Sequence, residues 1–528
     1  MLDILIKNAR ILDGTGNPWQ PGDVAVKDGR IAGMGRVKGE AAQTIDAAGL
    51  YCTPGFIDPH GHDEGYALTD EETHAKLSQG VTTDVSGNCG LSLAPVSPSH
   101  ADELSAAMAL LSPPKNLRDF LTFDDFLRAM EARPHAINLA YQVGHGALRI
   151  AVTGMENRPA TAKELDAMCG MLREALQSGA VGMSVGMLYP PGNIATQDEL
   201  VALCRILRDY DRIMTIHIRD EADRVVESVE EAIELARLSG CFVNISHHKA
   251  LGLSNWGKVN TTLKLIEEAN EQGVAVGFDQ YPYNANCTGL NTILPPSYLL
   301  TDQAELVNNL RKQDFREQLR HAIMNPTEIW DNYARNVGMD RTLVIKADST
   351  PEAVGIRVSE YAATRNMDPL DAAFQLLADN NLDVVAVYFS IGDDDIATVM
   401  RNINGMFGSD GIYVPGGKKT HPRIMGTMPR VLGHYVREKG VLRLEEAVRK
   451  MTSLPARRMR LARKGLLLEG YDADITLFDA ATVTDTADFI KDSYAPNQGI
   501  HHVIVNGRIA MTNNQYTGAA SGKVYRAR

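Results

Sequence analysis

The chain has 528 residues, of which 44% are hydrophobic and 23% are charged, and this composition excludes a disordered or collagen-like protein. Its 53 Lys and Arg residues stand against 66 Asp and Glu residues, so the formal net charge is −13. A chain with this charge repels polyanions, and we therefore expect neither nucleic acid nor an anionic membrane as a partner.

The apolar runs and the cysteines indicate in which cellular compartment the protein works. No stretch reaches the roughly 18 uncharged apolar residues that a membrane helix needs, and charges come too early in MLDILIKNARILDG for the core of a signal peptide. The six cysteines are spread singly without a CxxC pair, which argues against a disulfide framework and a zinc ribbon. We expect a cytoplasmic protein, and the sequence makes no prediction of its oligomeric state.

The first fifty residues alternate short apolar runs with turn dipeptides, as in ILIKNARILDGTG and DVAVKDGRIAGMG. Asp-Gly between β-rich flanks is a strong hairpin signal, because Gly tolerates the positive φ that the turn requires. The same pattern returns only near the other end, in DADITLFD and HHVIVNGRIAMTNNQYTG. We therefore predict a small β-sandwich domain built from both termini, residues 1–53 and 464–528.

Between residues 54 and 463, short apolar strands alternate with helical stretches. The strand candidates are, in chain order, GFIDPH, VTTDVSG, INLAYQVGH, AVGMSVG, IMTIHIR, CFVNISHH, VAVGFDQY and GMFGSD. This alternation predicts an α/β fold with parallel strands and crossover helices, and about eight units predict a (β/α)8 barrel. Two further strand candidates, RTLVIKA and VVAVYFS, indicate an insertion around residues 290–390. A doubly wound open sheet is the alternative fold.

Almost every candidate strand ends in a His, Cys or Asp residue. In a barrel, these positions converge on the C-terminal face, where active sites lie. The candidates are His60, His62, Cys89, His217, His247 and Asp410. Because side chains alternate along an extended strand, His60 and His62 share one face and can reach one ion.

The residue types in this set favour a metal site. Imidazole and thiolate together suit a borderline-soft divalent ion, with zinc expected, and the carboxylate of Asp410 can act as a ligand or a base. Taken singly, a His at a strand end is more often structural, and a lone Cys is usually an apolar filler. Their recurrence at separate strands makes the metal site the preferred interpretation.

Several motifs carry a resemblance to a known family. They are PGFIDPHGHDE (54–64), GNCG (87–90), GMLYPPG (186–192), ISHHK (245–249), FDQYPYNA (278–285), GSDG (408–411) and HPRIMGTMPRVLGHYVRE (421–438). The HxH after PGFID resembles the amidohydrolase superfamily as a whole. The GNCG, YPPG and HPR elements together resemble, more specifically, its D-aminoacylase (N-acyl-D-amino-acid deacylase) family. The resemblance implies a TIM-like metal-dependent hydrolase barrel.

The resemblance also implies roles for individual residues. A tight zinc ion would be held by Cys89, His217 and His247. A second, weaker metal position would be formed by His60 and His62 with Cys89 and Asp410. The substrate would be contacted by Lys249, Arg423 and Tyr283. Arg offers a planar fork suited to a carboxylate and Lys a compact charge, so these two would bind the substrate carboxylate.

The function implied is hydrolysis of the amide of a small-molecule N-acyl-D-amino acid to a carboxylate and a free D-amino acid. Zinc would lower the pKa of its water towards about 7, while Asp410 would take the water proton and deliver it to the leaving nitrogen. No basic residue is evident to pair with a carboxylate on the substrate side chain, which favours apolar D-residues.

Other functions stay open at this point. Within the superfamily, they are ring opening of a hydantoin or dihydropyrimidine and cleavage of a dipeptide with a C-terminal D-residue. A non-catalytic, metal-dependent scaffold is the alternative from another class, and the near-complete ligand set argues against it. A hydrolase that uses Cys89 as its nucleophile is the weakest alternative.

Overall fold

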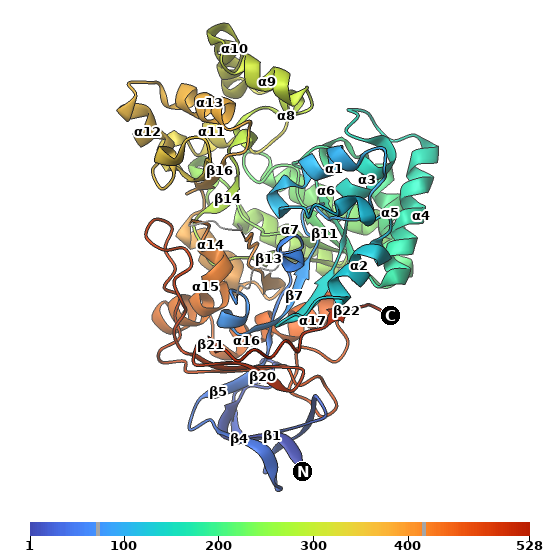
Figure 1. Ribbon diagram of the computed structural model, residues 1–528, viewed down its shortest axis with the longest axis vertical. Coiled ribbons are helices and arrows are strands. Elements are labelled where there is room, and N and C mark those ends of the chain that lie inside the picture. Colours follow the sequence, from blue (N-terminus) through green and yellow to red (C-terminus); the bar gives the residue numbers. More distant parts are fainter. Residues whose placement is uncertain (70–73, 414–418) are drawn as a thin grey trace.

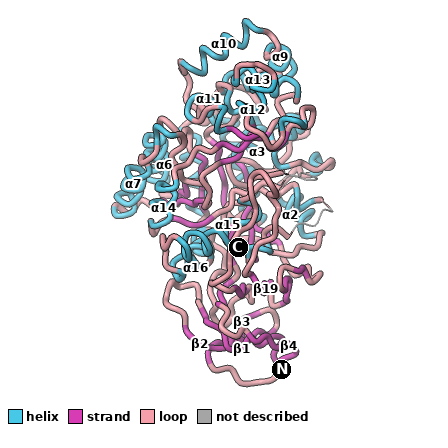
Figure 2. Tube along the Cα trace, turned by 90° about the vertical axis from the view of Figure 1, so that its left-hand side faces the viewer, coloured by secondary structure: helices cyan, strands magenta, loops and turns pink. Residues whose placement is uncertain are grey.

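The computed structural model describes residues 1–69, 74–413 and 419–528. The molecule is elongated, with strands from both chain ends at its lower end, the barrel in the middle and the helices of residues 296–379 (α8 to α13) at the top (Figure 1). The view turned by 90° shows the same order along the long axis (Figure 2). Among the described helices, none is long and apolar enough to cross a membrane.

The two chain ends form one β unit. Its sheet runs in the order β21-β20-β19-β18-β5-β1-β2-β3, with β4 paired to β1. The strands are β1 (Leu2–Ile11), β2 (Gln20–Lys27), β3 (Arg30–Gly35), β4 (Ala41–Asp46), β5 (Tyr51–Pro54), β18 (Ile475–Phe478), β19 (Ile500–Val505), β20 (Arg508–Thr512) and β21 (Gln515–Tyr516). Both predicted hairpins are present, because Asp28-Gly29 and Asn506-Gly507 have positive φ at both positions. This is the predicted β-sandwich of the two termini.

The central part is the predicted barrel. Its strands are β6 (Phe56–Asp58), β7 (Val81–Ser86), β8 (Asn138–Tyr141) continued by β9 (Val143–Gly144), β10 (Gly182–Gly186), β11 (Ile213–His217), β12 (Phe242–Ile245), β13 (Val276–Gln280) and β17 (Gly405–Phe407). Neighbouring strands pair in parallel from β6 round to β17. A parallel bridge between Gly61 and Gly411 closes the ring. Each strand candidate from the sequence therefore contains a barrel strand, and the open-sheet alternative is wrong.

Helices cover the outside of the barrel. They are α1 (Ala101–Ala107), α2 (Phe123–Glu131), α3 (His145–Thr153), α4 (Ala162–Ser178), α5 (Gln197–Asp209), α6 (Val225–Ser239), α7 (Val259–Glu271), α14 (Asp393–Arg401), α15 (Arg423–Arg430), a π-helical turn (Val431–Glu438), α16 (Leu444–Met451) and α17 (Ser453–Arg458). In α4, Thr161 and Glu164 form a capping box at the start, and Gly179 ends the helix with φ of 119°. Its buried residues recur at helical spacing and face the core.

A separate unit lies between β13 and β17. Its three antiparallel strands are β14 (Asn286–Gly289), β15 (Thr342–Lys346) and β16 (Val385–Tyr388). Its helices are α8 (Pro296–Leu299), α9 (Gln303–Asn309), α10 (Gln313–Met324), α11 (Tyr333–Asn336), α12 (Val358–Thr364) and α13 (Pro369–Asp379). These elements share a core of their own that includes Leu319, Phe374 and Leu377. We call residues 286–388 the insertion; the domain boundaries at residues 53 and 463 stay a prediction.

The chain returns to the barrel after the β-sandwich. Strand β22 (Val524–Tyr525) pairs in parallel with β8, and the Ala527 amide donates to the carbonyl of Gly179 at 2.9 Å. The Arg526 guanidinium pairs with Asp124 and Glu131 of α2. This segment therefore fills the place beside β8 at the end of the barrel away from the insertion (Figure 1).

Candidate metal centre

The ends of five barrel strands bring the six predicted metal ligands together. One donor atom from each of His60, His62, Cys89 and Asp410 lies within 4.8 Å of the others, and so do those of Cys89, His217 and His247. Cys89 belongs to both groups. The structure thus forms two adjoining candidate metal positions that share one thiol.

The backbone at this site is unusual. Cys89, His247 and Asp410 adopt left-handed conformations, with φ of 54°, 35° and 50°. Such conformations cost about 1–3 kcal/mol each for residues other than Gly, and they cluster at functional sites. At the neighbouring Gly90, a Cβ atom would lie 2.6 Å from the backbone nitrogen of Gly186. The tight loop that presents Cys89 therefore depends on a glycine at position 90.

Buried carboxylates orient two of the imidazoles. Nδ1 of His60 lies 2.9 Å from Asp279, and Nδ1 of His247 lies 2.9 Å from Glu221. With Nδ1 engaged, the Nε2 atoms of His60 and His247 lie 3.4 Å and 3.5 Å from the sulfur of Cys89. Carboxylate partners of this kind are typical of metal-binding His residues. The sequence analysis missed both acids, although Asp279 lies in a barrel strand.

Unpartnered polar atoms point to a bound cation. Among the described residues, Nδ1 of His62 and both ring nitrogens of His217 are buried without a hydrogen bond of ordinary geometry. Buried polar atoms are nearly always paired, and a metal ion would satisfy these. Burial would raise the pKa of the Cys89 thiol, but His60 and His247 hold that pKa well below its ordinary value. The thiolate is the form that binds metal, so this Cys and His donor set fits zinc.

Asp410 lies at the edge of the same cluster. Its carboxylate is 3.3 Å from Nε2 of His62 and 2.7 Å from the guanidinium of Arg423. Burial would raise the pKa of Asp410, but Arg423 and His247 hold it well below the ordinary range. Asp410 is therefore an ionised carboxylate that can bind a cation or accept a proton.

The two predicted carboxylate binders lie in different environments. Lys249 lines the main cavity and donates to Glu221 at 2.6 Å. Arg423 is only 1% exposed, and its guanidinium lies 4.7 Å from the centre of the Tyr281 ring. The structure thus brings Lys249 to the cavity, whereas Arg423 lies behind Asp410 and Tyr281.

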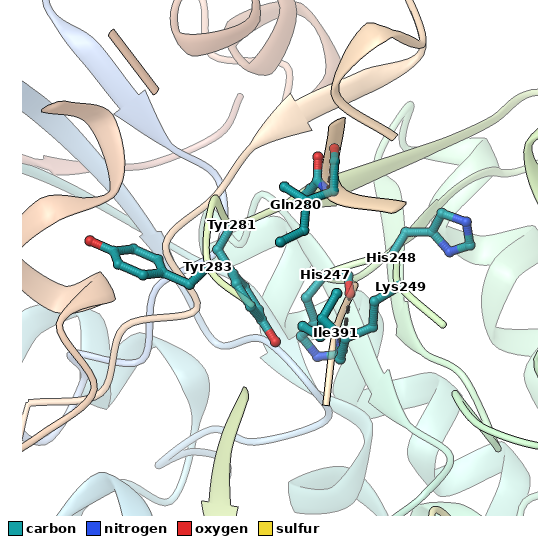
Figure 3. Close-up of a pocket in the computed structure, with 8 residues that line it drawn as sticks. His247, His248, Lys249, Gln280, Tyr281, Tyr283 and Ile391 are labelled. Atoms are coloured by element: carbon teal, nitrogen blue, oxygen red, sulfur yellow. Dashed lines mark hydrogen bonds between the residues drawn. The ribbon is translucent and has the colours of Figure 1, made fainter. Parts of the chain in front are cut away.

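Tyr283 is not brought to the main cavity. Its hydroxyl donates to Asp485 at 3.2 Å, whereas Tyr281 lines the cavity and its hydroxyl has no hydrogen-bond partner among the described residues. Figure 3 shows the Tyr281 hydroxyl close to His247 and the Tyr283 side chain pointing away. His248 also points away from His247 and bonds Thr262 at 2.9 Å. Tyr281 is therefore a site residue that the sequence analysis missed, and a substrate contact by Tyr283 stays a prediction.

Two cavities adjoin the cluster. The small one, drawn in Figure 3, has about 10 Å³, roughly the space of one water molecule, between Gln280, Tyr281 and Lys249. The main one has a volume of about 500 Å³ and extends from Cys89 and Asp410 between the insertion and the segment around α1. A volume of this size is typical of sites for small organic ligands, which take about 300–1,000 Å³.

A buried lysine joins three strands next to the cluster. The ammonium of Lys76 donates to Asp58 and to Ser409, the latter at 2.9 Å, and lies 2.9 Å from Asp84. Asp58 also accepts from the backbone amides of His60 and Ser409, at 3.1 Å and 2.9 Å. Lys76 therefore fastens the ends of β6, β7 and β17, which carry four of the six candidate ligands.

We expect Lys76→Met to destabilise the protein, because it leaves Asp58 and Asp84 as buried, unpaired carboxylates. Breaking a buried ion pair in this way costs about 3–5 kcal/mol. The entropy of unfolding is about 1 kcal/mol/K for a chain of this size, so the melting temperature should fall by about 3–5 °C. The matched control is Lys264→Met, at a side chain that is 75% exposed. Equal melting temperatures for the two variants would contradict the role of Lys76.

Comparison with known proteins agrees with this geometry. The amidohydrolase family matches residues 43–511. A D-aminoacylase and an N-acyl-D-aspartate deacylase, both from Alcaligenes xylosoxydans xylosoxydans, are 38% and 39% identical to this chain. The first match covers 99% of this chain and 97% of the relative, and the second covers 98% and 93%.

A solved structure gives the same result. The N-acyl-D-glutamate deacylase of Bordetella bronchiseptica, crystallised with zinc and a phosphonate mimic of the tetrahedral intermediate, is 36% identical over the full length of both chains. It superposes on this structure with a TM-score of 0.85. The chain therefore belongs to the D-aminoacylase (N-acyl-D-amino-acid deacylase) family of metal-dependent amidohydrolases.

Proposed function

We propose that this protein hydrolyses the amide bond of N-acyl-D-amino acids with neutral side chains, using zinc bound at the cluster around Cys89. The observation that carries the proposal is that two sets of metal ligands, an ionised Asp410 and the side chain of Lys249 converge beside one cavity. The relatives named above, which act on N-acyl-D-amino acids by name, support the substrate class.

The tight zinc would be held by Cys89, His217 and His247, and a second, weaker position would use His60 and His62 with Cys89 and Asp410. When bound, zinc supplies a lowered pKa for water and polarisation of the acyl carbonyl. The residues of the chain would orient the ligands and exclude water. Asp279 and Glu221 keep the imidazoles oriented towards the sulfur, and burial keeps bulk water away from the reacting atoms.

Asp410 is the proposed general base and acid. It is ionised, so it can accept the proton of the attacking water and then deliver it to the leaving nitrogen. An amine leaves poorly unless it is protonated, and such proton transfer contributes about 10²–10⁴-fold to the rate. Its contact with Arg423 at 2.7 Å keeps the carboxylate directed into the site.

Lys249 and Tyr281 would bind the α-carboxylate of the substrate. Both line the cavity next to His247, and the ammonium of Lys249 lies 5.7 Å from the centre of the Tyr281 ring. The charge of Lys249 and the unpartnered Tyr281 hydroxyl are suited to a carboxylate. Anchoring the substrate here would orient its amide towards Asp410, and such positioning can supply several kcal/mol.

The charges around the cavity support neutral D-side chains. Relatives that act on D-aspartate and D-glutamate derivatives are as similar to this chain as the D-aminoacylase is, at 36–39% identity, so similarity does not choose among them. Among the described residues that line the cavity, Lys249 is the one Lys or Arg, whereas Glu103, Glu221, Asp383 and Asp410 are acids. A second carboxylate on the substrate would therefore lack a cation to pair with.

A substrate panel with measured zinc content tests this function. We expect turnover of N-acetyl-D-methionine and N-acetyl-D-leucine, at least tenfold weaker turnover of the D-aspartate and D-glutamate derivatives, and none of the L-isomers. A 5-substituted hydantoin and a dipeptide with a C-terminal D-residue test the rival amidohydrolase reactions. Zinc-loaded protein that opens the hydantoin but leaves the linear amides intact would overturn the proposal.

We expect Arg423→Ala to change the pH dependence of the reaction. Removing the positive charge raises the pKa of Asp410, so a higher pH is needed to keep the base ionised. An opposite charge at this distance lowers the pKa of a carboxylate by about 1–3. The acid limb of kcat/KM should therefore move up by about one pH unit or more.

The control for Arg423→Ala is Arg365→Ala, which removes an ion pair with Glu352 on the surface of the insertion. This variant should keep the pH profile of the parent protein. If Arg423→Ala also kept the parent profile and only raised KM, Arg423 would act on the substrate alone.

A further inference from the structure

The main cavity is larger than an acetylated amino acid requires. Its volume of about 500 Å³ would hold a drug-sized ligand, whereas N-acetyl-D-leucine has only twelve atoms other than hydrogen. The cavity therefore has room for a larger substituent, either on the acyl carbon or on the α-carbon of the substrate.

The order of the barrel strands separates two walls of the cavity. Lys249 follows β12 and Tyr281 follows β13, whereas Leu91 and α1 follow β7. In the closed ring of strands, β7 lies opposite β12. The proposed carboxylate anchor and the segment around α1 therefore face each other across the mouth of the barrel.

The wall opposite the anchor is apolar. It consists of Leu91, Ala106, Ala107, Met108, Gly146 and Met155, which we call the acyl wall. The nearby charge is that of Glu103, whose carboxylate already accepts hydrogen bonds from His100 and from the backbone of Met155, at 3.0 Å and 2.6 Å. Such a surface favours an aliphatic chain and disfavours an anion.

The connectivity of the substrate decides which substituent meets this wall. The α-carboxylate and the D-side chain share one carbon on the nitrogen side of the amide, and the acyl group lies on the other side. With the carboxylate at Lys249 and the carbonyl at the metal ligands, the acyl group extends away from Lys249 towards the acyl wall. The D-side chain stays near the anchor, beneath the insertion residues Cys287 and Thr288.

We propose that the preferred substrates carry a medium-length aliphatic acyl group, much longer than acetyl, that lies along the acyl wall. This inference rests on the proposed deacylase function. Each methylene buried on this wall would raise kcat/KM by up to about fourfold. Six additional methylenes would therefore outweigh the cost of ordering the chain.

The test compares N-acetyl-, N-butyryl-, N-hexanoyl- and N-octanoyl-D-leucine with the zinc-loaded protein, each below its micelle-forming concentration. We expect kcat/KM to be at least tenfold higher for the octanoyl than for the acetyl substrate. N-succinyl-D-leucine has the same acyl length as the butyryl substrate and adds a carboxylate, and we expect it to be at least tenfold poorer than the butyryl substrate.

A pair of variants tests whether the acyl wall causes the preference for longer acyl chains. Ala106 is exposed and lines the cavity, so Ala106→Trp fills the wall without disturbing the core. We expect it to lower the ratio of octanoyl to acetyl kcat/KM at least tenfold. The control Ala363→Trp, at an exposed position of α12 in the insertion, should keep the parent ratio.

The outcomes separate this inference from the proposed function. If the acetyl substrate is turned over and kcat/KM falls as the acyl chain lengthens, the inference is overturned and the deacylase function still stands. An unchanged ratio in Ala106→Trp would overturn the assignment to the acyl wall. Absence of turnover for every D-substrate, with zinc bound, would overturn both.

Discussion

Asp410→Asn should retain its zinc and lose at least 99% of kcat. The amide is nearly the same size as the carboxylate and can still accept the contact from Arg423, but it does not take up a proton at neutral pH. Loss of a general acid and base typically costs about 10²–10⁴-fold. The residual rate should also lose the acid limb of the pH profile, because the group that titrates there is gone.

The measurements for Asp410→Asn are kcat and KM for N-acetyl-D-methionine with the zinc content per chain determined on the same samples. Asp166→Asn is the matched control, because it makes the same change at an exposed position of α4, away from the site. It should keep most of kcat. Normal turnover by Asp410→Asn at full zinc content would remove Asp410 from the mechanism.

Cys89→Ala should lose the tightly bound zinc and with it the activity. The thiol is the one donor that both candidate metal positions share. Removing it leaves two imidazoles at one position, and two imidazoles with one carboxylate at the other. Loss of an outer partner of a metal ligand already costs about 10–100-fold in affinity, so loss of the ligand itself should cost more.

The zinc content of Cys89→Ala is measured after dialysis against a weak chelator. Replacement of zinc by cobalt gives a second readout, since the sulfur-to-cobalt absorption band should appear in the parent protein and be missing in the variant. Cys169→Ala is the control, because Cys169 lies in α4 within the barrel's hydrophobic core. Undiminished zinc in Cys89→Ala would contradict the ligand assignment.

The sequence predicted the barrel and the convergence of its strand ends well. The strands are nearly continuous apolar runs followed by polar residues, and this pattern depends only on burial within a parallel sheet. The hairpin signals at Asp28 and Asn506 also identified the sandwich, because Asp-Gly and Asn-Gly between apolar strands are typical of tight hairpin turns.

The orientation of individual site residues was harder to predict. Alternation with a period of two holds only inside a strand, and β13 ends at Gln280, before both tyrosines. Alternation would place Tyr281 and Tyr283 on the same face, whereas the chain turns at Pro282 and sends them to different sides. His247 and Asp410 likewise lie beyond their strands in left-handed conformations, which no periodicity reveals.

The partners of the ligands could not be found from spacing either. Glu221 lies four residues after His217 but bonds His247 and Lys249, which come from the next barrel strand. Asp279 of β13 likewise bonds His60, which follows β6, the second strand along from β13 in the ring. Such contacts depend on the three-dimensional arrangement of strand ends and leave no local pattern in the sequence.

The insertion has its own hydrophobic core and enters and leaves the barrel between β13 and β17. None of the six candidate metal ligands among the described residues comes from it, although it forms one side of the main cavity. Exchange of residues 286–388 between homologues should thus transfer the selectivity for the D-side chain without changing the reaction. Evolution and protein engineering can therefore treat this unit as an interchangeable module.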